Sequence, residues 1–302
     1  MALHLVTGAS GMVGKALIQQ LKAAGHEVRV LTTRTPSRPE KCIYGWNPDL
    51  GELDPAAFRG VEVVYHLAGA TVSKPWTARH RAAILTSRKL STSLLVSELG
   101  KLPKDDRPKT VVCASAVGIY PDQAAGTPLL EESHAPGTGF LADVVKSWET
   151  ATDAFRGLGM RTVQLRIGVV LGHGGALEAM LPVFRMGLGS ALGSGEQWMP
   201  WIHVDDVAAA FVYAGKTESM DGVYNTVSPH PATNRDFSAA LARALKRPFW
   251  LPSPPAWVLR LALGERSILL LGSTPASAKK MQEAGFAFRY PELNAALQTL
   301  FR

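Results

Sequence analysis

Cysteine is scarce in this chain, with only Cys42 and Cys113 among 302 residues. So few cysteines, spaced so far apart, form neither a disulfide framework nor a metal-ligand cluster, and the sequence therefore predicts no bound metal. Cys113 lies within an apolar run, where a cysteine behaves as a small core residue. The scarcity of cysteine is typical of a reducing compartment, and we expect a cytoplasmic location.

Long apolar runs are also missing. No stretch reaches the roughly 18 uninterrupted apolar residues of a transmembrane helix, and the N-terminus lacks the basic and apolar regions of a secretory signal. With 46% hydrophobic and 19% charged residues, the composition is that of a globular protein with a substantial core. We therefore expect no membrane partner.

The formal charge of +7 is moderate, and the basic residues are scattered rather than interleaved with aromatic ones. Single-strand binding grooves combine positive charge with aromatic stacking platforms. The pattern here favours a solvated basic surface over nucleic-acid binding. We expect a small-molecule substrate, and a chain that acts as a monomer or a homodimer.

A glycine-rich segment follows the first apolar run, Leu3–Val6, and precedes a helix-like stretch, Lys15–Ala24. In this strand–turn–helix order, Gly8 permits a tight turn, Gly11 lets the backbone approach a pyrophosphate, and Gly14 lets the helix pack on the strand. The helix N-terminus offers unpaired N–H groups to the anion. An ordinary glycine turn is the alternative, but the context favours dinucleotide binding. The predicted phosphate-binding residues are Gly8, Ser10, Gly11, Met12, Val13 and Gly14.

Short apolar runs alternate with helix-length segments over the first half of the chain. Such alternation is typical of a parallel sheet covered on both faces. The sequence therefore predicts an α/β fold with a Rossmann-type, doubly wound parallel sheet, whose ligand lies at the carboxyl ends of the strands. The predicted strands are 3–6, 28–32, 61–67, 110–114, 162–170 and 223–226, and the predicted helices are 14–24, 77–99 and 141–158.

After Gly172 the pattern loosens and glycine becomes dense. We expect residues 1–172 to form the nucleotide-binding domain, with segments near 200–228 returning to it. Residues 173–302 would form a smaller C-terminal region on the substrate side.

Several elements are predicted within that C-terminal region. Thr233 or Asn234 is expected to cap a helix that ends near residue 245. Pro275 and Pro291 are expected at the first position of two later helices, with a short strand at Phe286–Tyr290 between them.

The second predicted strand ends in Leu31-Thr32-Thr33-Arg34, without the acidic residue that binds the ribose hydroxyls of NAD. The Arg34 guanidinium and the Thr33 hydroxyl are suitable donors to a 2′-phosphate. The alternative is that Arg34 is only a surface charge. The sequence predicts NADP(H) as the cofactor in preference to NAD(H).

These motifs resemble the extended short-chain dehydrogenase/reductase superfamily. His66–Gly69 matches the segment after a cofactor-binding strand, Ala114–Tyr120 a serine-bearing strand end, and Trp201–Val207 the epimerase/dehydratase hallmark. More narrowly, the chain is similar to an atypical epimerase-family branch of uncertain function, through residues 87–88, 146–149, 166–172, 193–198 and 285–286. The resemblance extends from residue 7 to about residue 290.

The resemblance implies further cofactor contacts. Leu67, Ala68 and Gly69 would lie beneath the adenosine half of the cofactor. Arg88 would reach its phosphates, unless it is a solvated helix charge. Val170 would lie near the nicotinamide end, unless it is plain core.

The catalytic pattern of the superfamily is incomplete. Its usual chemistry needs a tyrosine four residues before a lysine, assisted by a serine or threonine. Lys146 fits the lysine position, but Ala142 stands where the tyrosine belongs, and Phe140 has no hydroxyl. Ser115 and Lys146 are the remaining catalytic candidates.

Other polar residues near the hallmark are expected to be structural. His203 lies between apolar neighbours, and Asp205 and Asp206 are expected to cap the following helix. Two functions stay open. One is an NADP-dependent oxidoreductase or epimerase acting on a small carbonyl or sugar-like compound, and the other is a noncatalytic NADP(H)-binding redox sensor or regulator.

Overall fold

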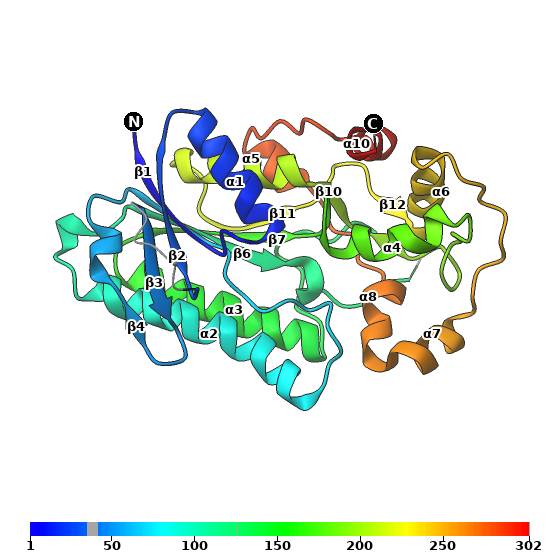
Figure 1. The fold of residues 1–302 in the computed structure, drawn as a ribbon, viewed down its shortest axis with the longest axis horizontal. Helices are drawn as coiled ribbons and strands as arrows, with labels where there is room; N and C mark the ends of the chain where they lie inside the picture. Colours follow the sequence, from blue (N-terminus) through cyan, green and yellow to red (C-terminus); the bar gives the residue numbers. More distant parts are fainter. Residues whose placement is uncertain (35–41, 125, 302) are drawn as a thin grey trace.

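The computed structural model describes residues 1–34, 42–124 and 126–301 (Figure 1). Its strands are β1 (Leu3–Thr7), β2 (Glu27–Thr32), β3 (Ile43–Asn47), β4 (Glu52–Leu53), β5 (Val63–His66), β6 (Thr110–Ala116), β7 (Arg161–Ile167), β8 (Val169–Leu171), β9 (Trp198–Met199), β10 (Trp201–His203), β11 (Gly222–Thr226) and β12 (Ala232–Thr233).

The α-helices are α1 (Met12–Ala23), α2 (Ala78–Gly100), α3 (Phe140–Gly157), α4 (Gly175–Arg185), α5 (Val204–Lys216), α6 (Asn234–Ala244), α7 (Ala256–Leu263), α8 (Ile268–Leu271), α9 (Lys279–Glu283) and α10 (Leu293–Leu300). Short 3-10 turns are η1 (Pro55–Phe58), η2 (Lys104–Asp106), η3 (Val117–Ile119) and η4 (Gly264–Ser267).

The central sheet has the strand order β11-β7-β6-β5-β1-β2-β3-β4. Each neighbouring pair is parallel except β3 and β4, which are antiparallel. The chain builds outward from β1 through β2 and β3, then crosses back to place β5 on the other side of β1. The predicted doubly wound sheet is confirmed, and its topological switch point lies between β1 and β5.

Helices cover both faces of this sheet (Figure 1). On one face α1 and α5 pack together, and on the other α2 packs against α3. Alternate residues of each strand supply the two cores: Val6 and Tyr65 belong to the α1–α5 side, whereas Leu5 and Val64 belong to the α2–α3 side. Cys113 is fully buried in the second core, which confirms its predicted place.

Two strands of the central sheet were not predicted from the sequence. They are β3 and the short β4, which extend the sheet at its β2 edge.

The predicted strand 162–170 is in fact two strands, because the chain turns away at Gly168. A Cβ there would lie 2.4 Å from the Pro200 carbonyl oxygen, so only glycine allows this approach. Beyond it, β8 pairs with β10 instead of β6.

The C-terminal region has its own core between α4, α6 and α10, with Phe237 and Leu297 fully buried. The predicted helix start at residues 233–234 is confirmed, because Thr233 and Asp236 form a reciprocal capping box at the N-terminus of α6. The division of the chain at residue 172 stays a prediction.

The two proline placements are wrong. Pro275 is extended, and its carbonyl oxygen accepts a hydrogen bond from the Leu130 N–H at 2.6 Å, so α9 begins only at Lys279. Pro291 precedes Glu292, the residue that caps α10.

The predicted strand at Phe286–Tyr290 is also absent from the described structure. The backbone N–H groups of Arg289 and Tyr290 donate to the buried carboxylate of Asp206, at 2.8 and 2.9 Å. A side chain therefore satisfies the donors that strand pairing would use.

Candidate functional site

The glycine-rich turn between β1 and α1 has the geometry that its sequence predicts. Gly8 adopts a φ of +71°, and a Cβ there would lie 2.8 Å from the Leu67 carbonyl group. A Cβ on Gly14 would lie 2.3 Å from the Gly8 oxygen, so α1 packs directly on the turn. Both positions therefore require glycine.

The N-terminus of α1 is left open to solvent. Gly11 is its N-cap, with no side-chain cap and no acidic residue in the first turn. Ser10 and Gly11 are exposed. The first turn of the helix thus brings no carboxylate of its own to compete for these N–H groups, which suits a phosphate group.

A cleft of about 700 Å³ lies beside this turn, at the switch point of the sheet. Its walls come from the glycine turn, the ends of β2 and β3, the loop after β5, and α2. The cleft is lined by Gly8, Ala9, Ser10, Val30, Leu31, Thr32, Thr33, Arg34, Ile43, Trp46, Pro48, Asp49, Ala68, Gly69, Ala70, Ser87 and Ser91.

Six of the predicted cofactor residues are brought together by this cleft: Gly8, Ser10, Thr33, Arg34, Ala68 and Gly69. Thr33 and Arg34 are both exposed at its β2 side. The structure therefore joins the predicted phosphate turn to the predicted 2′-phosphate donors in a single hollow.

Trp46 and Asp49 line the same cleft but were not predicted as site residues. They belong to β3 and the turn after it, in a segment to which the sequence analysis assigned no strand. The alternating run Ile43-Tyr44-Gly45-Trp46, followed by Pro48, was the available signal for a strand that ends there.

A buried polar network fixes the loop after β5. The Thr7 hydroxyl accepts hydrogen bonds from the N–H groups of Leu67 and Ala68, both at 3.1 Å. Its own hydrogen therefore points to Nδ1 of His66, 2.9 Å away. On the far side, Nε2 of His66 donates to Thr92 at 3.0 Å, because the Thr92 hydroxyl donates to the Arg88 carbonyl group.

His66 is neutral in this network. Burial, reinforced by the charge of Arg88, lowers the pKa of its imidazole to about 3. A single tautomer with the hydrogen on Nε2 satisfies every partner, so β1, the loop after β5 and α2 are held together without any charge.

Arg88 lies behind the loop, where its guanidinium stacks 4.7 Å from the centre of the Trp148 ring. Its Nη1 donates to the carbonyl groups of Ala70 and Ile84, at 3.0 and 2.9 Å. A Cβ on Gly69 would lie 3.1 Å from the guanidinium carbon. Burial lowers the pKa of Arg88 to about 10, still far above neutrality.

This arginine is half-buried, yet none of the salt bridges in the described part of the chain includes it. A partly buried cation of this kind normally has an anionic partner. Its position behind Gly69 fits a phosphate-bearing ligand in the adjoining cleft.

The remaining predicted cofactor residues are not among those that line the cleft. A Cβ on Gly172 would lie 2.7 Å from the Met12 sulfur, so Met12 lies against the turn that follows β8. Val13, Leu67 and Val170 pack on the core beneath α1 and α5.

The two catalytic candidates are not brought together by any recorded contact. The buried Ser115 hydroxyl donates to Oε1 of Glu149 at 2.6 Å. Lys146 instead pairs with Asp143 at 2.7 Å on the outer part of α3. Ala142, at the position of the missing tyrosine, is buried. Both candidate side chains are thus engaged by carboxylates of α3.

Glu149 is the centre of a larger buried network. Its two carboxylate oxygens accept from Nε and Nη2 of Arg166, each at 2.8 Å. Arg166 also donates to the Tyr120 hydroxyl at 2.9 Å, and Tyr120 donates to Asn225 at 2.7 Å.

Two groups of this network, Arg166 and Tyr120, have shifted pKa values. Burial disfavours the Arg166 charge, but the Glu149 carboxylate outweighs it and raises the pKa of Arg166 above its usual value. Burial raises the pKa of the Tyr120 hydroxyl. Neither group is suited to exchange protons near neutral pH.

The hallmark segment, Trp201–Val207, forms β10 and the first turn of α5. His203 is buried and caps α5, because its Nδ1 accepts a hydrogen bond from the Asp205 N–H at 3.1 Å. The predicted capping by Asp205 and Asp206 is therefore wrong. Asp206 turns away to bind the backbone of Arg289 and Tyr290.

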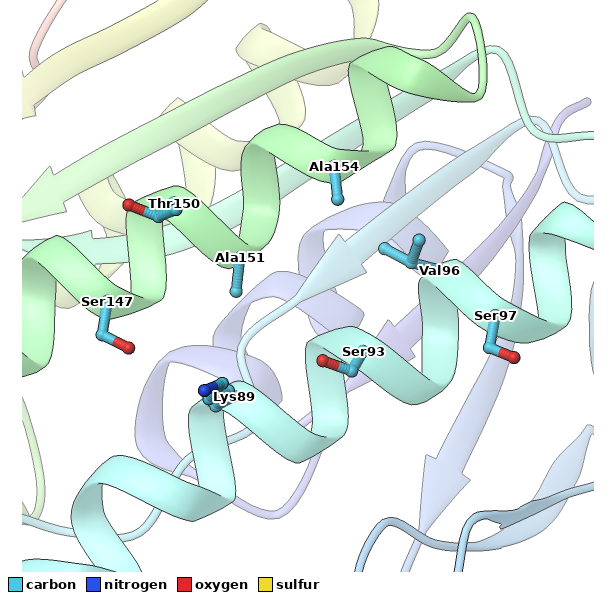
Figure 2. A pocket seen from close by; sticks show the side chains of 8 residues that line it. All are labelled: Lys89, Ser93, Val96, Ser97, Ser147, Thr150, Ala151 and Ala154. Carbon is cyan, nitrogen blue, oxygen red and sulfur yellow. The ribbon is translucent and has the colours of Figure 1, made fainter.

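A second hollow, of about 440 Å³, lies between α2 and α3 on the outside of the molecule (Figure 2). Small and polar side chains line it, and none belongs to the predicted site. They are Lys89, Ser93, Val96, Ser97, Ser147, Thr150, Ala151 and Ala154. Neither the glycine-rich turn nor the strand ends contribute a residue to this groove.

The described residues, 35–41, 125 and 302 being outside them, contain no cluster of histidine, cysteine and acidic side chains that could hold a metal ion. Over the same part of the chain, none of the helices has the length and hydropathy needed to cross a bilayer.

Comparison with known proteins identifies related families along most of the chain. A model of the NAD dependent epimerase/dehydratase family matches residues 4–226, and a domain of unknown function, DUF1731, matches residues 254–300. An epimerase family protein of Staphylococcus aureus is 34% identical over 302 residues, covering 99% of each chain.

Two further relatives carry the same family name. The SDR39U1 homolog of Arabidopsis thaliana, described as chloroplastic, is 36% identical over 304 residues, which cover 98% of this chain and 86% of that protein. The crystal structure of human epimerase family protein SDR39U1 (isoform2) with NADPH has a TM-score of 0.86 at 32% identity, covering 99% of this chain and 98% of the human one. The chain therefore belongs to the NAD dependent epimerase/dehydratase family, as the resemblance of its motifs predicts.

Proposed function

We propose that this chain binds NADP(H) in the cleft at the switch point and prefers it to NAD(H). The observation that carries the proposal is that the glycine turn, the Thr33–Arg34 strand end and the Ala68–Gly69 loop line one cleft. The open N-terminus of α1 suits a pyrophosphate, and the Arg34 guanidinium suits a 2′-phosphate. The human relative that was crystallised with NADPH supports this choice.

We propose that predicted residues outside the lining of the cleft complete the site. Arg88 donates through Nη1 to two carbonyl groups, and its remaining N–H groups are suited to a cofactor phosphate. Met12 and Val13 belong to the first turn of α1, and Leu67 and Val170 supply apolar surface beside it.

We infer that the activity is that of an oxidoreductase or an epimerase on a small carbonyl or sugar-like compound. When bound, a nicotinamide cofactor supplies or accepts a hydride, and the protein's part is to bind and orient it. Because Ala142 replaces the tyrosine, and Ser115 and Lys146 are engaged by carboxylates, we propose that water or a nonstandard residue moves the proton.

A noncatalytic NADP(H)-binding sensor or regulator is the second candidate. It is favoured by a specific observation: Ser115 and Tyr120, the hydroxyl groups nearest the strand end, are both locked into the Glu149–Arg166 network. The two proposed functions are distinguished by mixing the protein with NADPH and a panel of carbonyl compounds and following the nicotinamide absorbance. Oxidation of NADPH by one compound supports the enzyme, whereas tight binding without turnover across the panel supports the sensor.

Cofactor preference is tested by replacing Arg34 with alanine. The loss of charge-assisted hydrogen bonds worth ~1.5–3 kcal/mol is expected to weaken NADPH binding by about 10- to 100-fold. NADH has no 2′-phosphate, so its affinity should stay nearly unchanged. Fluorescence titration with both cofactors measures the two affinities.

Arg79→Ala is the matched control, since Arg79 is exposed on α2 and does not line the cleft. It should leave both affinities as they are. An equal loss of NADPH and NADH affinity in Arg34→Ala would show that Arg34 does not contact the 2′-phosphate.

A further inference from the structure

Exposed large apolar side chains gather at one end of the molecule. Of the fourteen recorded as exposed in the described part of the chain, nine lie within residues 183–188 and 250–269. We call these nine residues the apolar end: Val183, Met186, Leu188, Trp250, Trp257, Val258, Leu261, Ile268 and Leu269.

The segments of the apolar end are joined by direct contacts. A Cβ on Gly187 would lie 3.5 Å from Pro248, which places the end of α4 beside the loop that carries Trp250. The Gly193 N–H donates to the Pro254 carbonyl group at 3.0 Å, just before α7. Figure 1 shows α7 and α8 projecting together at the margin of the molecule, below α4.

The side chains of the apolar end are more exposed than scattered apolar residues on a protein surface usually are. Leu261 is 82% exposed, Trp250 73% and Trp257 66%, and α7 contains no buried residue. An eight-residue helix has little stability of its own in water. So many exposed large apolar side chains at one end of a molecule normally have a partner.

The charges around the apolar end are predominantly basic. Residues 183–192 and 243–264 contain five basic residues and no acidic one: Arg185, Arg243, Lys246, Arg247 and Arg260. All five side chains are exposed. The next acidic residue, Glu265, is already paired with Arg81 of α2.

We propose that the apolar end docks peripherally on an anionic bilayer. Tryptophan and leucine side chains of a projecting helix enter the boundary between headgroups and acyl chains, and flanking arginine and lysine side chains bind the anionic headgroups. A lipid surface explains both features together, because a tryptophan-bearing and predominantly basic patch complements a deformable anionic surface. This proposal departs from the sequence-based expectation of no membrane partner. The contact is peripheral, since none of the helices in the described part of the chain is long and apolar enough to span a bilayer.

Docking would also orient the nucleotide-binding region. Arg266 Nη1 donates to the Ser73 carbonyl group at 3.1 Å, and Arg81 pairs with Glu265. Through these contacts η4 is attached to the loop and helix that follow Ala70, a residue of the cofactor cleft. The apolar end therefore has a fixed relation to that side of the cleft.

The test is sedimentation of the full chain with vesicles of phosphatidylcholine alone and of phosphatidylcholine mixed with phosphatidylglycerol. We expect binding to the mixed vesicles only, with release at high salt and a blue shift of tryptophan emission. Leu261→Glu should weaken binding about tenfold or more, because it removes an inserted side chain and adds repulsion. Arg247→Glu should weaken it about fivefold or more.

Leu50→Glu is the matched control, because Leu50 is 69% exposed but lies in the β3–β4 turn. It should bind like the unaltered chain, and thermal unfolding checks that each variant is folded. The proposal is overturned if the unaltered chain fails to sediment with the mixed vesicles, or if Leu261→Glu sediments equally well. It is also overturned if gel filtration shows a dimer that Leu261→Glu converts to a monomer, since a second copy would then be the occupant.

Discussion

Several single residues at the switch point could be predicted from the sequence because their positions require a particular residue type. Gly8 and Gly14 allow contacts that any Cβ would block, and their spacing was sufficient to predict the turn. Arg34 was predicted from the lack of an acidic residue at the end of β2, and it lines the cleft. Trp46 and Asp49 could not be predicted in the same way, because their place in the cleft depends on how β3 pairs with β2.

At this scale, Gly11→Asp is expected to weaken dinucleotide binding by about 100-fold or more, because it places a carboxylate beside the N–H groups that would bind the pyrophosphate. Gly11 is exposed, so the fold should persist. Calorimetric titration with NADPH measures the loss. Gly157→Asp, at a helix end where a side chain meets open space, is the control. Unchanged NADPH affinity in Gly11→Asp would remove the phosphate-turn argument.

Among the elements, the α/β alternation of the first half was predictable because buried parallel strands are short apolar runs between turn signals. The C-terminal elements were less so, since their ends are set by tertiary hydrogen bonds. Asp206, for example, takes the backbone donors of Arg289 and Tyr290 that a strand would have used. The role of Ser115 was also beyond sequence reasoning, because its partner Glu149 reaches it only through the packing of α3 on β6.

The network that joins α3 to β7 should be costly to break. Glu149→Gln would leave Arg166 buried without its carboxylate, and we expect the free energy of unfolding to fall by about 3–5 kcal/mol. Chemical denaturation measures this change. Replacing both partners, as Glu149→Gln with Arg166→Met, should recover part of the loss. A cost below about 1 kcal/mol for Glu149→Gln would mean that the pair does not hold these elements together.

For the whole molecule, the order of strands places the cleft between β1 and β5, and two buried histidines lie in or beside the same strands. Burial lowers the pKa of His4 to about 4, with help from the charges of His26 and Lys216, and that of His66 to about 3. Among the described residues, neither imidazole nitrogen of His4 has a hydrogen-bond partner. Both residues are therefore neutral in the folded chain and charged in the unfolded chain at mildly acidic pH.

Stability should consequently depend on pH. Between the unfolded pKa of about 6.5 and the folded values, the unfolded chain binds more protons, so stability is full above pH 6.5 and is lost on acidification. Each histidine contributes up to ~1.4 kcal/mol per pH unit within its window. Urea denaturation from pH 7 to pH 4.5 measures the slope. His4→Leu should lessen it, and an identical slope in that variant would contradict the assignment to His4.

The central claim, that the switch-point cleft binds NADP(H), is tested most directly by calorimetric titration of the unaltered chain with NADPH and then with NADH. The account predicts one NADPH site per chain and markedly weaker binding of NADH, because only NADPH carries the 2′-phosphate that we propose Arg34 binds. Equal affinities would contradict the role of Arg34. If neither cofactor gave any heat of binding, the assignment of the cleft as a cofactor site would be contradicted.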